Sequence, residues 1–412
     1  MNLASIDGAT LLAQLHILGN IGAEEGRGRT RLAASDEDKA ARDQLCDWMR
    51  ELDMAVHVDE IGNIFGVYPA QGGHEDALMI GSHIDTVRQA GMFDGCYGVL
   101  AGLAVVRALR AAGIVPPRPV VVAAFTNEEG VRFHPDMMGS LAHAGGISVA
   151  DVLDARDDDG KRLGDELARI GYAGNMPAGS IRPREYLELH IEQGPVLEAE
   201  HLAIGVVDSL QGISWQRVTI RGTANHAGTT PVHLRHDAGY AAAAFVTFLR
   251  EQVVALAPAI MRATVGSLRL LPDAINVIPG EAVFTIDLRC ADEALLQQAE
   301  AMIARFADEI AAREGVRVER ESLARFQPVQ FDAALADAIE QAVQTLGYPY
   351  KRMTSGAGHD AQMIARIAPA AMIFVPSRDG ISHNPREYTD DAHLLQGAQV
   401  LLEAVQARMG GK

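Results

Sequence analysis

Two apolar runs, ALMI at residues 77–80 and VVVAAF at residues 120–125, flank a segment of helical periodicity at residues 99–112. Short apolar runs bounded by polar loops are typical of buried strands. A strand, a helix and a second strand in this order predict a βαβ unit, and hence an α/β fold with a mostly parallel sheet and flanking helices. In such folds the functional loops follow the carboxyl ends of the strands.

The pattern changes after residue 212. Alternating and helical segments then follow in the order strand, helix, two strands, helix and strand, beginning with residues 213–220, 237–256, 261–270, 281–289 and 291–313. This order predicts a small α+β domain with an antiparallel sheet. Because helix and strand alternate again after residue 329, we expect a catalytic domain of residues 1–211 and 329–412, interrupted by a smaller domain of residues 212–328.

Composition excludes several classes of protein. The 412 residues carry a formal net charge of −18, and no cluster of Lys and Arg offsets it. Such a surface repels nucleic acid and anionic membranes, so we expect neither as a partner. Cys46, Cys96 and Cys290 are too few and too widely spaced for a disulfide framework or a cysteine-based zinc site. The chain has neither a basic leader nor a long uninterrupted apolar span, which predicts a cytoplasmic location.

Polar residues that could bind a metal follow the two runs. His83 and Asp85 come directly after the first run, and Asp94 lies eleven residues beyond His83. Glu128 and Glu129 follow the second run. Adjacent carboxylates at a strand end point in different directions, so one can bind a metal while its neighbour acts as a general base. The first cluster alone is equally well explained as a polar loop, and an acidic pair like the second is more commonly a solvated loop.

Two further histidines extend the set. His190 lies in the alternating segment ELHIEQG at residues 188–194, and His383 follows an apolar run at residues 370–376. One histidine is more often structural than a ligand, but four clusters around one sheet favour a shared site. Imidazoles and carboxylates without a thiolate suit Zn²⁺, Mn²⁺, Co²⁺ or Ni²⁺. Five donors exceed the needs of one tetrahedral catalytic ion, so we expect two ions bridged by Asp94. The expected ligands are His83, Asp94, Glu129, His190 and His383.

The expected insert has polar residues of its own, His226, Asn276 and Arg289. Arginine is a natural bidentate partner of a substrate carboxylate, and a histidine with an asparagine can donate hydrogen bonds to a developing oxyanion. Taken singly, they are more simply explained as turn and surface residues. Nearer the C-terminus, Gly358 permits close backbone approach to a ligand. His359 either contacts substrate or starts a helix.

Together these motifs resemble the hydantoinase/carbamoylase amidases of the M20 metallopeptidase-like superfamily, in consistent order from about residue 80 to 390. The matching segments are residues 83–85, 94–95, 128–130, 188–194, 226–231, 356–360 and 380–383. The resemblance implies that the five expected ligands hold two metal ions, that Asp85 orients His83, and that Glu128 is the general base. It marks His190 as a feature of the amidase subgroup. It also assigns substrate placement to Gln193, His226, Asn276, Arg289 and Gly358.

The activity implied by the resemblance is metal-dependent hydrolysis of a linear ureido C–N bond. N-carbamoyl-L-amino acids are the first choice of substrate, with amino acid, ammonia and carbon dioxide as products. Allantoate amidohydrolase and β-ureidopropionase are alternatives within the group, and aminoacylase or dipeptidase is an alternative in the wider superfamily. A non-catalytic binding protein is disfavoured because both Glu128 and Glu129 are present. The resemblance further implies a homodimer, in which the insert serves as dimerisation and lid domain and His226 acts in the partner subunit's site.

Overall fold

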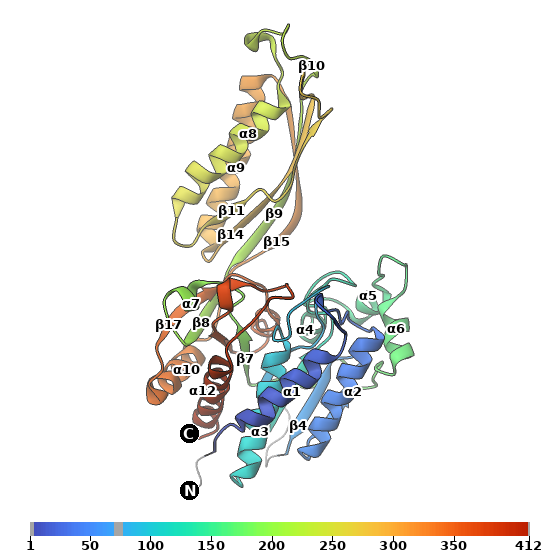
Figure 1. Cartoon of the computed structure of the whole chain (residues 1–412), viewed down its shortest axis with the longest axis vertical. Helices are drawn as coiled ribbons and strands as arrows, with labels where there is room; N and C mark the ends of the chain where they lie inside the picture. Colours follow the sequence, from blue (N-terminus) through green and yellow to red (C-terminus); the bar gives the residue numbers. More distant parts are fainter. Residues whose placement is uncertain (1–3, 70–76, 411–412) are drawn as a thin grey trace. The chain divides into compact units, whose positions relative to one another are not determined.

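The computed structural model describes residues 4–69 and 77–410 and divides into two compact units (Figure 1). Unit 1 contains the residues up to Asp208 and from Phe331 onward, and unit 2 contains Ser209–Gln330. The outermost residues of the predicted catalytic domain, 1–3 and 411–412, lie outside the described residues.

Unit 1 is built on a mixed sheet. The four central strands β18, β7, β5 and β6 are parallel to one another, and antiparallel strands extend the sheet on both sides. The predicted α/β class is therefore confirmed. In spatial order the strands are β8 (Ile204–Leu210), β18 (Ala370–Val375), β7 (Glu185–Ile191), β5 (Leu78–His83), β6 (Val120–Phe125), β4 (Ile64–Tyr68) and β3 (Ala55–Val58), with β17 (Tyr350–Ser355) also paired to β8. The short strand β16 (Val329–Gln330), whose residues are counted with unit 2, pairs with Ser209 and Leu210 at the end of β8.

Helices pack against this sheet. Helix α3 contacts β5, β6 and β7, α12 contacts β7 and β18, and α2 contacts β3 and β4. The helices of unit 1 are α1 (Gly8–Asn20), α2 (Asp36–Glu51), α3 (Cys96–Ala111), α4 (Met138–His143), α5 (Val149–Asp154), α6 (Leu163–Ile170), α7 (Val196–Ala199), α10 (Ala333–Leu346), α11 (Asp360–Ile364) and α12 (Asp391–Gly410), and a short hairpin joins β1 (Ala23–Glu24) to β2 (Gly28–Arg29). Within residues 4–69 and 77–410, no helix combines the length and apolar character needed to cross a membrane.

The central strands form because their side chains can be buried on both faces. Every residue of β5, β6, β7 and β18 is buried. Continuous apolar runs are the expected composition of such parallel strands. The few polar side chains in these strands therefore need partners inside the protein.

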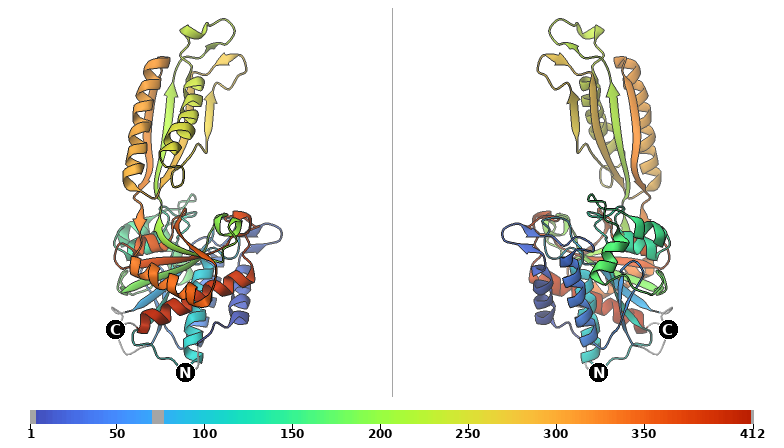
Figure 2. Two further views of the ribbon diagram at one scale, coloured as in Figure 1. Left: turned by 90° about the vertical axis from the view of Figure 1, so that its left-hand side faces the viewer. Right: turned by 90° about the vertical axis from the view of Figure 1, so that its right-hand side faces the viewer.

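Unit 2 is an antiparallel sheet covered on one face by two helices (Figure 2). Its main sheet has the order β11, β14, β9, β15, with β12 also paired to β14, and a separate two-stranded ribbon joins β10 to β13. The elements are β9 (Gly212–Arg221), β10 (Asn225–His226), α8 (Ala238–Phe248), β11 (Arg262–Thr264), β12 (Leu268–Leu271), β13 (Val277–Ile278), β14 (Glu281–Cys290), α9 (Glu293–Glu314) and β15 (Arg317–Phe326). The predicted antiparallel insert is confirmed.

Two elements differ in detail from the prediction. The strand expected over residues 261–270 is two strands, β11 and β12, which both pair with β14. The segment between Thr264 and Leu268 has one residue more than the facing segment of β14, so the hydrogen-bonded ladder is interrupted there. The helix expected over residues 237–256 is regular only to Phe248, and continues as a π-helical and then a 3-10 turn.

Candidate metal and catalytic site

The predicted metal ligands in unit 1 meet where the central parallel strands end. His83 is the last residue of β5, and His190 is the penultimate residue of β7. Glu129 lies in the loop after β6, and His383 lies in the loop that follows β18. Since the carboxyl ends of parallel strands share one edge of a sheet, strand direction explains why His83 and His383, 300 positions apart in sequence, both lie beside Asp94.

Two groups of ligand atoms share Asp94. Its Oδ1 lies 3.1 Å from His190 Nε2 and 3.5 Å from His83 Nε2, and its Oδ2 lies 3.2 Å from His383 Nε2. Glu129 Oε2 lies 3.4 Å from the same nitrogen of His383. Within each group the potential ligand atoms lie within 4.8 Å of one another. The groups are His83, Asp94 and His190, and Asp94, Glu129 and His383.

Hydrogen bonds orient the two buried histidines for metal binding. His83 Nδ1 lies 3.0 Å from the main-chain oxygen of Asp85, and His190 Nδ1 lies 2.8 Å from that of Ile191. A carbonyl oxygen only accepts, so Nδ1 carries a proton in each ring, and Nε2, on the side of Asp94, is the nitrogen that a metal ion would bind. Such an outer partner is the usual arrangement around a metal-binding histidine.

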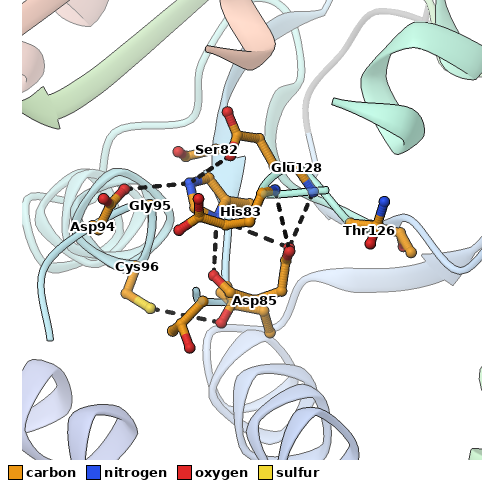
Figure 3. A network of polar contacts seen from close by, with 12 residues as sticks. Ser82, His83, Asp85, Asp94, Gly95, Cys96, Thr126 and Glu128 are labelled. Carbon is orange, nitrogen blue, oxygen red and sulfur yellow. Dashed lines mark hydrogen bonds and ion pairs between the residues drawn. The ribbon is translucent and has the colours of Figure 1, made fainter. Parts of the chain in front are cut away.

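Asp85 contacts His83 through its main chain. Its main-chain oxygen, and not its carboxylate, is hydrogen-bonded to His83, because the nearest carboxylate oxygen is 3.9 Å from Nδ1. The carboxylate instead accepts hydrogen bonds from the backbone N–H groups of Glu128 and Glu129, both at 3.3 Å (Figure 3). Asp85 therefore connects the histidine loop to the loop that carries the two glutamates.

The two adjacent glutamates face different partners, as predicted for residues with separate roles. Glu128 Oε2 lies 3.4 Å from His83 Nε2, whereas Glu129 lies beside His383 and accepts a hydrogen bond from the backbone N–H of Val87. Burial raises the pKa of Glu128 well above its usual range. Burial and the Asp94 carboxylate raise the pKa of Glu129 to about 8. Negative charge concentrated in a buried site fits a bound divalent cation, which would neutralise it.

Three residues hold the Asp94 carboxylate and its loop in place. Gln193 Nε2 donates to Asp94 Oδ2 at 2.7 Å, and the Ser382 hydroxyl lies 3.1 Å from the same oxygen. Glu387 accepts hydrogen bonds from the backbone N–H groups of Phe93 and Asp94. The sequence indicated Gln193 only through the resemblance, and it predicted no role for Ser382 or Glu387. No local pattern marks these two, since their partners lie nearly 300 residues away.

The loop at residues 355–360 also reaches this site. The His359 ring is buried, its centroid lies 4.6 Å from that of His190, and its Nε2 lies 3.1 Å from the Ser355 hydroxyl. Burial, with the nearby His190 charge, holds the pKa of His359 well below its usual range. At Gly358 a side chain would approach Met137 to 3.1 Å. His359 precedes α11, as one of its two expected roles required.

The three candidate residues of the insert occupy two sheets of unit 2. His226 lies in β10. The backbone N–H of Ala227 donates to the main-chain oxygen of Asn276 at 2.9 Å, so His226 and Asn276 belong to one ribbon. Arg289 is the penultimate residue of β14 in the larger sheet. Its guanidinium contacts the carboxylate of Asp287 at 3.0 and 3.1 Å. Sequence analysis did not identify Asp287.

Comparisons with known proteins agree with this arrangement. The profile of the peptidase family M20/M25/M40 matches residues 79–407. This chain belongs to that family. It is 39% identical over 390 residues to an N-carbamoyl-L-amino-acid amidohydrolase of Rhizobium meliloti, covering 94% of this chain and 93% of the relative. It is 34% identical to an allantoate amidohydrolase of Bacillus subtilis, covering 94% of each.

A solved structure supports the same subgroup. A hydantoinase/carbamoylase-family amidase from Burkholderia multivorans superposes with a TM-score of 0.96 at 41% identity, covering 99% of both chains. This M20 chain is therefore an amidohydrolase of the carbamoylase and allantoate amidohydrolase group, a metal-dependent hydrolase of linear amide C–N bonds. Its His, Asp and Glu clusters are candidate metal-binding groups.

Proposed function

We propose that this amidohydrolase hydrolyses the ureido C–N bond of N-carbamoyl-L-amino acids, giving the amino acid, ammonia and carbon dioxide. The observation that carries the proposal is Asp94 shared by two ligand groups, with the Glu128 carboxylate outside both groups and 3.4 Å from His83. The choice of substrate is supported by 39% identity to a carbamoyl-amino-acid hydrolase, against 34% to an allantoate hydrolase.

We assign the two ligand groups to two divalent ions. His83, Asp94 and His190 would hold one ion, and Asp94, Glu129 and His383 the other. Zn²⁺, Mn²⁺, Co²⁺ and Ni²⁺ suit such nitrogen and oxygen donors. Bound ions would supply Lewis acidity, which makes water more acidic and polarises a carbonyl group.

Glu128 is proposed as the general base and then the general acid. It takes a proton from the attacking water and transfers it to the leaving nitrogen, so that no net proton is consumed in the two transfers. Its place in the loop suits this role, because Asp85 holds the backbone N–H groups of Glu128 and Glu129. The Glu128 carboxylate therefore extends from a main-chain segment that is held in place.

His226 and Arg289 are proposed to bind the two polar ends of the substrate. His226 Nδ1 accepts hydrogen bonds from the backbone N–H groups of Gly228 and Thr229, at 3.0 and 3.2 Å. The proton of the neutral ring is therefore on Nε2, which can donate to developing oxyanion charge. Arg289, with Asn276, binds the substrate carboxylate. Gln193, Gly358 and His359 are the further proposed substrate contacts.

A homodimer joined through unit 2 is also proposed, with His226 acting in the partner subunit's site. Among the described residues, nine of the fourteen exposed large apolar side chains lie in unit 2. An excess of exposed apolar side chains is typical of a protein with an interaction surface. These nine are Trp215, Val232, Leu234, Tyr240, Val246, Leu268, Leu271, Ile275 and Leu323.

Ammonia release tests the proposed reaction. Metal-stripped protein is supplied with Mn²⁺, Co²⁺, Zn²⁺ or Ni²⁺ and given N-carbamoyl-L-methionine or allantoate. We expect metal-dependent release from the first substrate. Release from allantoate alone would replace the proposed substrate, and turnover of N-acetyl amino acids or dipeptides alone would indicate the aminoacylase or dipeptidase alternative.

The Glu128→Gln variant tests the proposed base. We expect kcat to fall about 10²- to 10⁴-fold, because the amide cannot take up the water proton. The metal content should stay at the wild-type value, since Glu128 is outside both ligand groups. Glu37→Gln, a change on the exposed face of α2, is the matched control. Wild-type turnover by Glu128→Gln would exclude the proposed role.

A further inference from the structure

Glu188 is a fully buried residue that the proposed reaction does not use. It lies in β7 two residues before His190, and the alternation of side chains along a strand places both on the same face of the sheet. A buried carboxyl group is costly unless hydrogen bonds satisfy it. The donors that contact Glu188 therefore indicate what this residue does.

Three donors from three elements of unit 1 meet at the Glu188 carboxyl group. Its Oε1 accepts a hydrogen bond from the Ser82 hydroxyl of β5 at 2.8 Å. Its Oε2 accepts from the Tyr186 hydroxyl of β7 at 3.2 Å and from the backbone N–H of Ala361 at 2.8 Å. All four residues are fully buried, so these bonds are shielded from water.

The bond from Ala361 connects the sheet with the loop at residues 355–360, although Glu188 and Ala361 are 173 positions apart in sequence. Ala361 is the second residue of α11, and this helix follows directly on Gly358 and His359. Helix α11 is only five residues long. A helix this short is not stable by itself, so its position depends on contacts such as the bond to Glu188.

Hydrogen bonds inside the loop transmit the position of α11 to the site. The Ser355 hydroxyl accepts from the backbone N–H of Ala357 at 3.2 Å and lies 3.1 Å from His359 Nε2. The main-chain oxygen of His359 accepts from the backbone N–H of Gln362 in α11 at 2.9 Å. A displacement of the start of α11 would therefore also displace the His359 ring, whose centroid lies 4.6 Å from that of His190.

We propose that Glu188 is a positioning residue, which fixes the start of α11 and thereby holds Gly358 and His359 beside His190. This inference rests on the proposed function, in which Gly358 and His359 contact the substrate. It does not require Glu188 to act on the metal ions, because both nitrogens of the His190 ring have other partners, the main-chain oxygen of Ile191 and the Asp94 carboxylate. The competing explanation is that Glu188 acts only through its negative charge.

Two conservative variants separate contact from charge. Glu188→Asp keeps the carboxyl group but is one carbon shorter, so the bond from Ala361 is lost. Glu188→Gln keeps the reach, because its amide oxygen can accept from Ala361 while its amide nitrogen donates to the Ser82 hydroxyl.

The two variants should differ in turnover of N-carbamoyl-L-methionine. We expect kcat/KM to fall about 10- to 100-fold in Glu188→Asp and less than about threefold in Glu188→Gln, because small displacements of substrate-positioning groups cost up to about 100-fold. The opposite order, or equal losses in both variants, would show that the charge matters and would overturn the proposal.

Tyr186→Phe is the matched control, since it removes one donor to Glu188 and leaves the bond from Ala361. We expect its kcat/KM to change less than about threefold, as one neutral hydrogen bond contributes little net stability. Metal content, measured by elemental analysis, should stay at the wild-type value in all three variants. Loss of metal from Glu188→Asp would show that Glu188 acts through His190, and would overturn the positioning role.

Hydrogen exchange followed by mass spectrometry observes the loop without turnover. In Glu188→Asp the peptide that covers residues 355–361 should exchange at least about tenfold faster than in wild type, and in Glu188→Gln and Tyr186→Phe at the wild-type rate. Unchanged exchange in Glu188→Asp, or faster exchange in every peptide, would overturn the proposal. Faster exchange confined to this peptide, in a protein whose wild type releases no ammonia, would refute the proposed reaction and support the placement of the loop by Glu188.

Discussion

The main chain after Asp94 passes so close to the His83 ring that it limits which residue can follow Asp94. Gly95 has a φ of +63°, and a Cβ at this position would lie 2.4 Å from atoms of the His83 ring. Glycine alone therefore lets the main chain after Asp94 pass under this histidine. Gly113, beyond the other end of α3, has a φ of +69° but no atom within 4 Å of the same position.

This pair of glycines gives a matched test of the loop. Gly95→Ala and Gly113→Ala should both lower the free energy of unfolding by about 1–2 kcal/mol, because alanine is strained at positive φ. Only Gly95→Ala should also displace His83. We therefore expect bound metal, measured by elemental analysis, to fall at least tenfold in Gly95→Ala and to stay unchanged in Gly113→Ala. Equal metal content in the two variants would contradict this account.

Helix α4 places a titratable residue, His143, in the core. Its last residue, His143, packs against Phe65 of β4 and Phe125 of β6, with ring centroids 5.2 and 5.8 Å apart. Burial lowers the pKa of His143 to about 4 from the ordinary 6.5. Between these values the unfolded chain takes up a proton that the folded chain does not, so His143 makes folding less favourable as the pH falls.

The pH dependence of stability tests this packing. The contribution of neutral His143 to the free energy of unfolding should be fully present above pH 6.5 and lost as the pH falls toward 4. Its slope should approach about 1.4 kcal/mol per pH unit. The free energy of unfolding, measured with urea, should therefore fall less between pH 7 and pH 5 in His143→Leu than in wild type. The exposed His16→Leu change on α1 controls for loss of a histidine, and identical slopes in wild type and His143→Leu would disprove the assignment.

The buried parallel strands were the elements that sequence patterns located best. The runs at residues 120–125 and 370–376 coincide with β6 and β18 within one residue, because buried parallel strands are continuous in apolar side chains. Helix α3 begins at Cys96, three residues before its predicted start, because Gly95 sets its first turn. The split of the third insert strand into β11 and β12 was not predicted, since an extra residue in a ladder leaves no clear periodic signal.

At the scale of the whole molecule, the proposed dimer predicts a mass in solution of twice 44.1 kDa. Light scattering after size-exclusion chromatography measures it. Replacing Leu234 and Ile275, both exposed in unit 2, by Glu should give the monomer, because buried charges destabilise an apolar interface. Val115→Glu, at an exposed residue of unit 1, is the matched control and should stay dimeric. A monomeric wild type would exclude the dimer.

The sequence by itself determined the α/β class, the antiparallel insert and the chemistry of the ligands, because periodicity and residue type are local properties. Only the tertiary structure decided that the Asp85 carboxylate holds the glutamate loop and that Glu387 supports residues nearly 300 positions away. It also decided that Trp215 of β9 donates a hydrogen bond to Asp287 of the neighbouring strand β14. Such contacts depend on strand pairing across the chain, and no short segment encodes them.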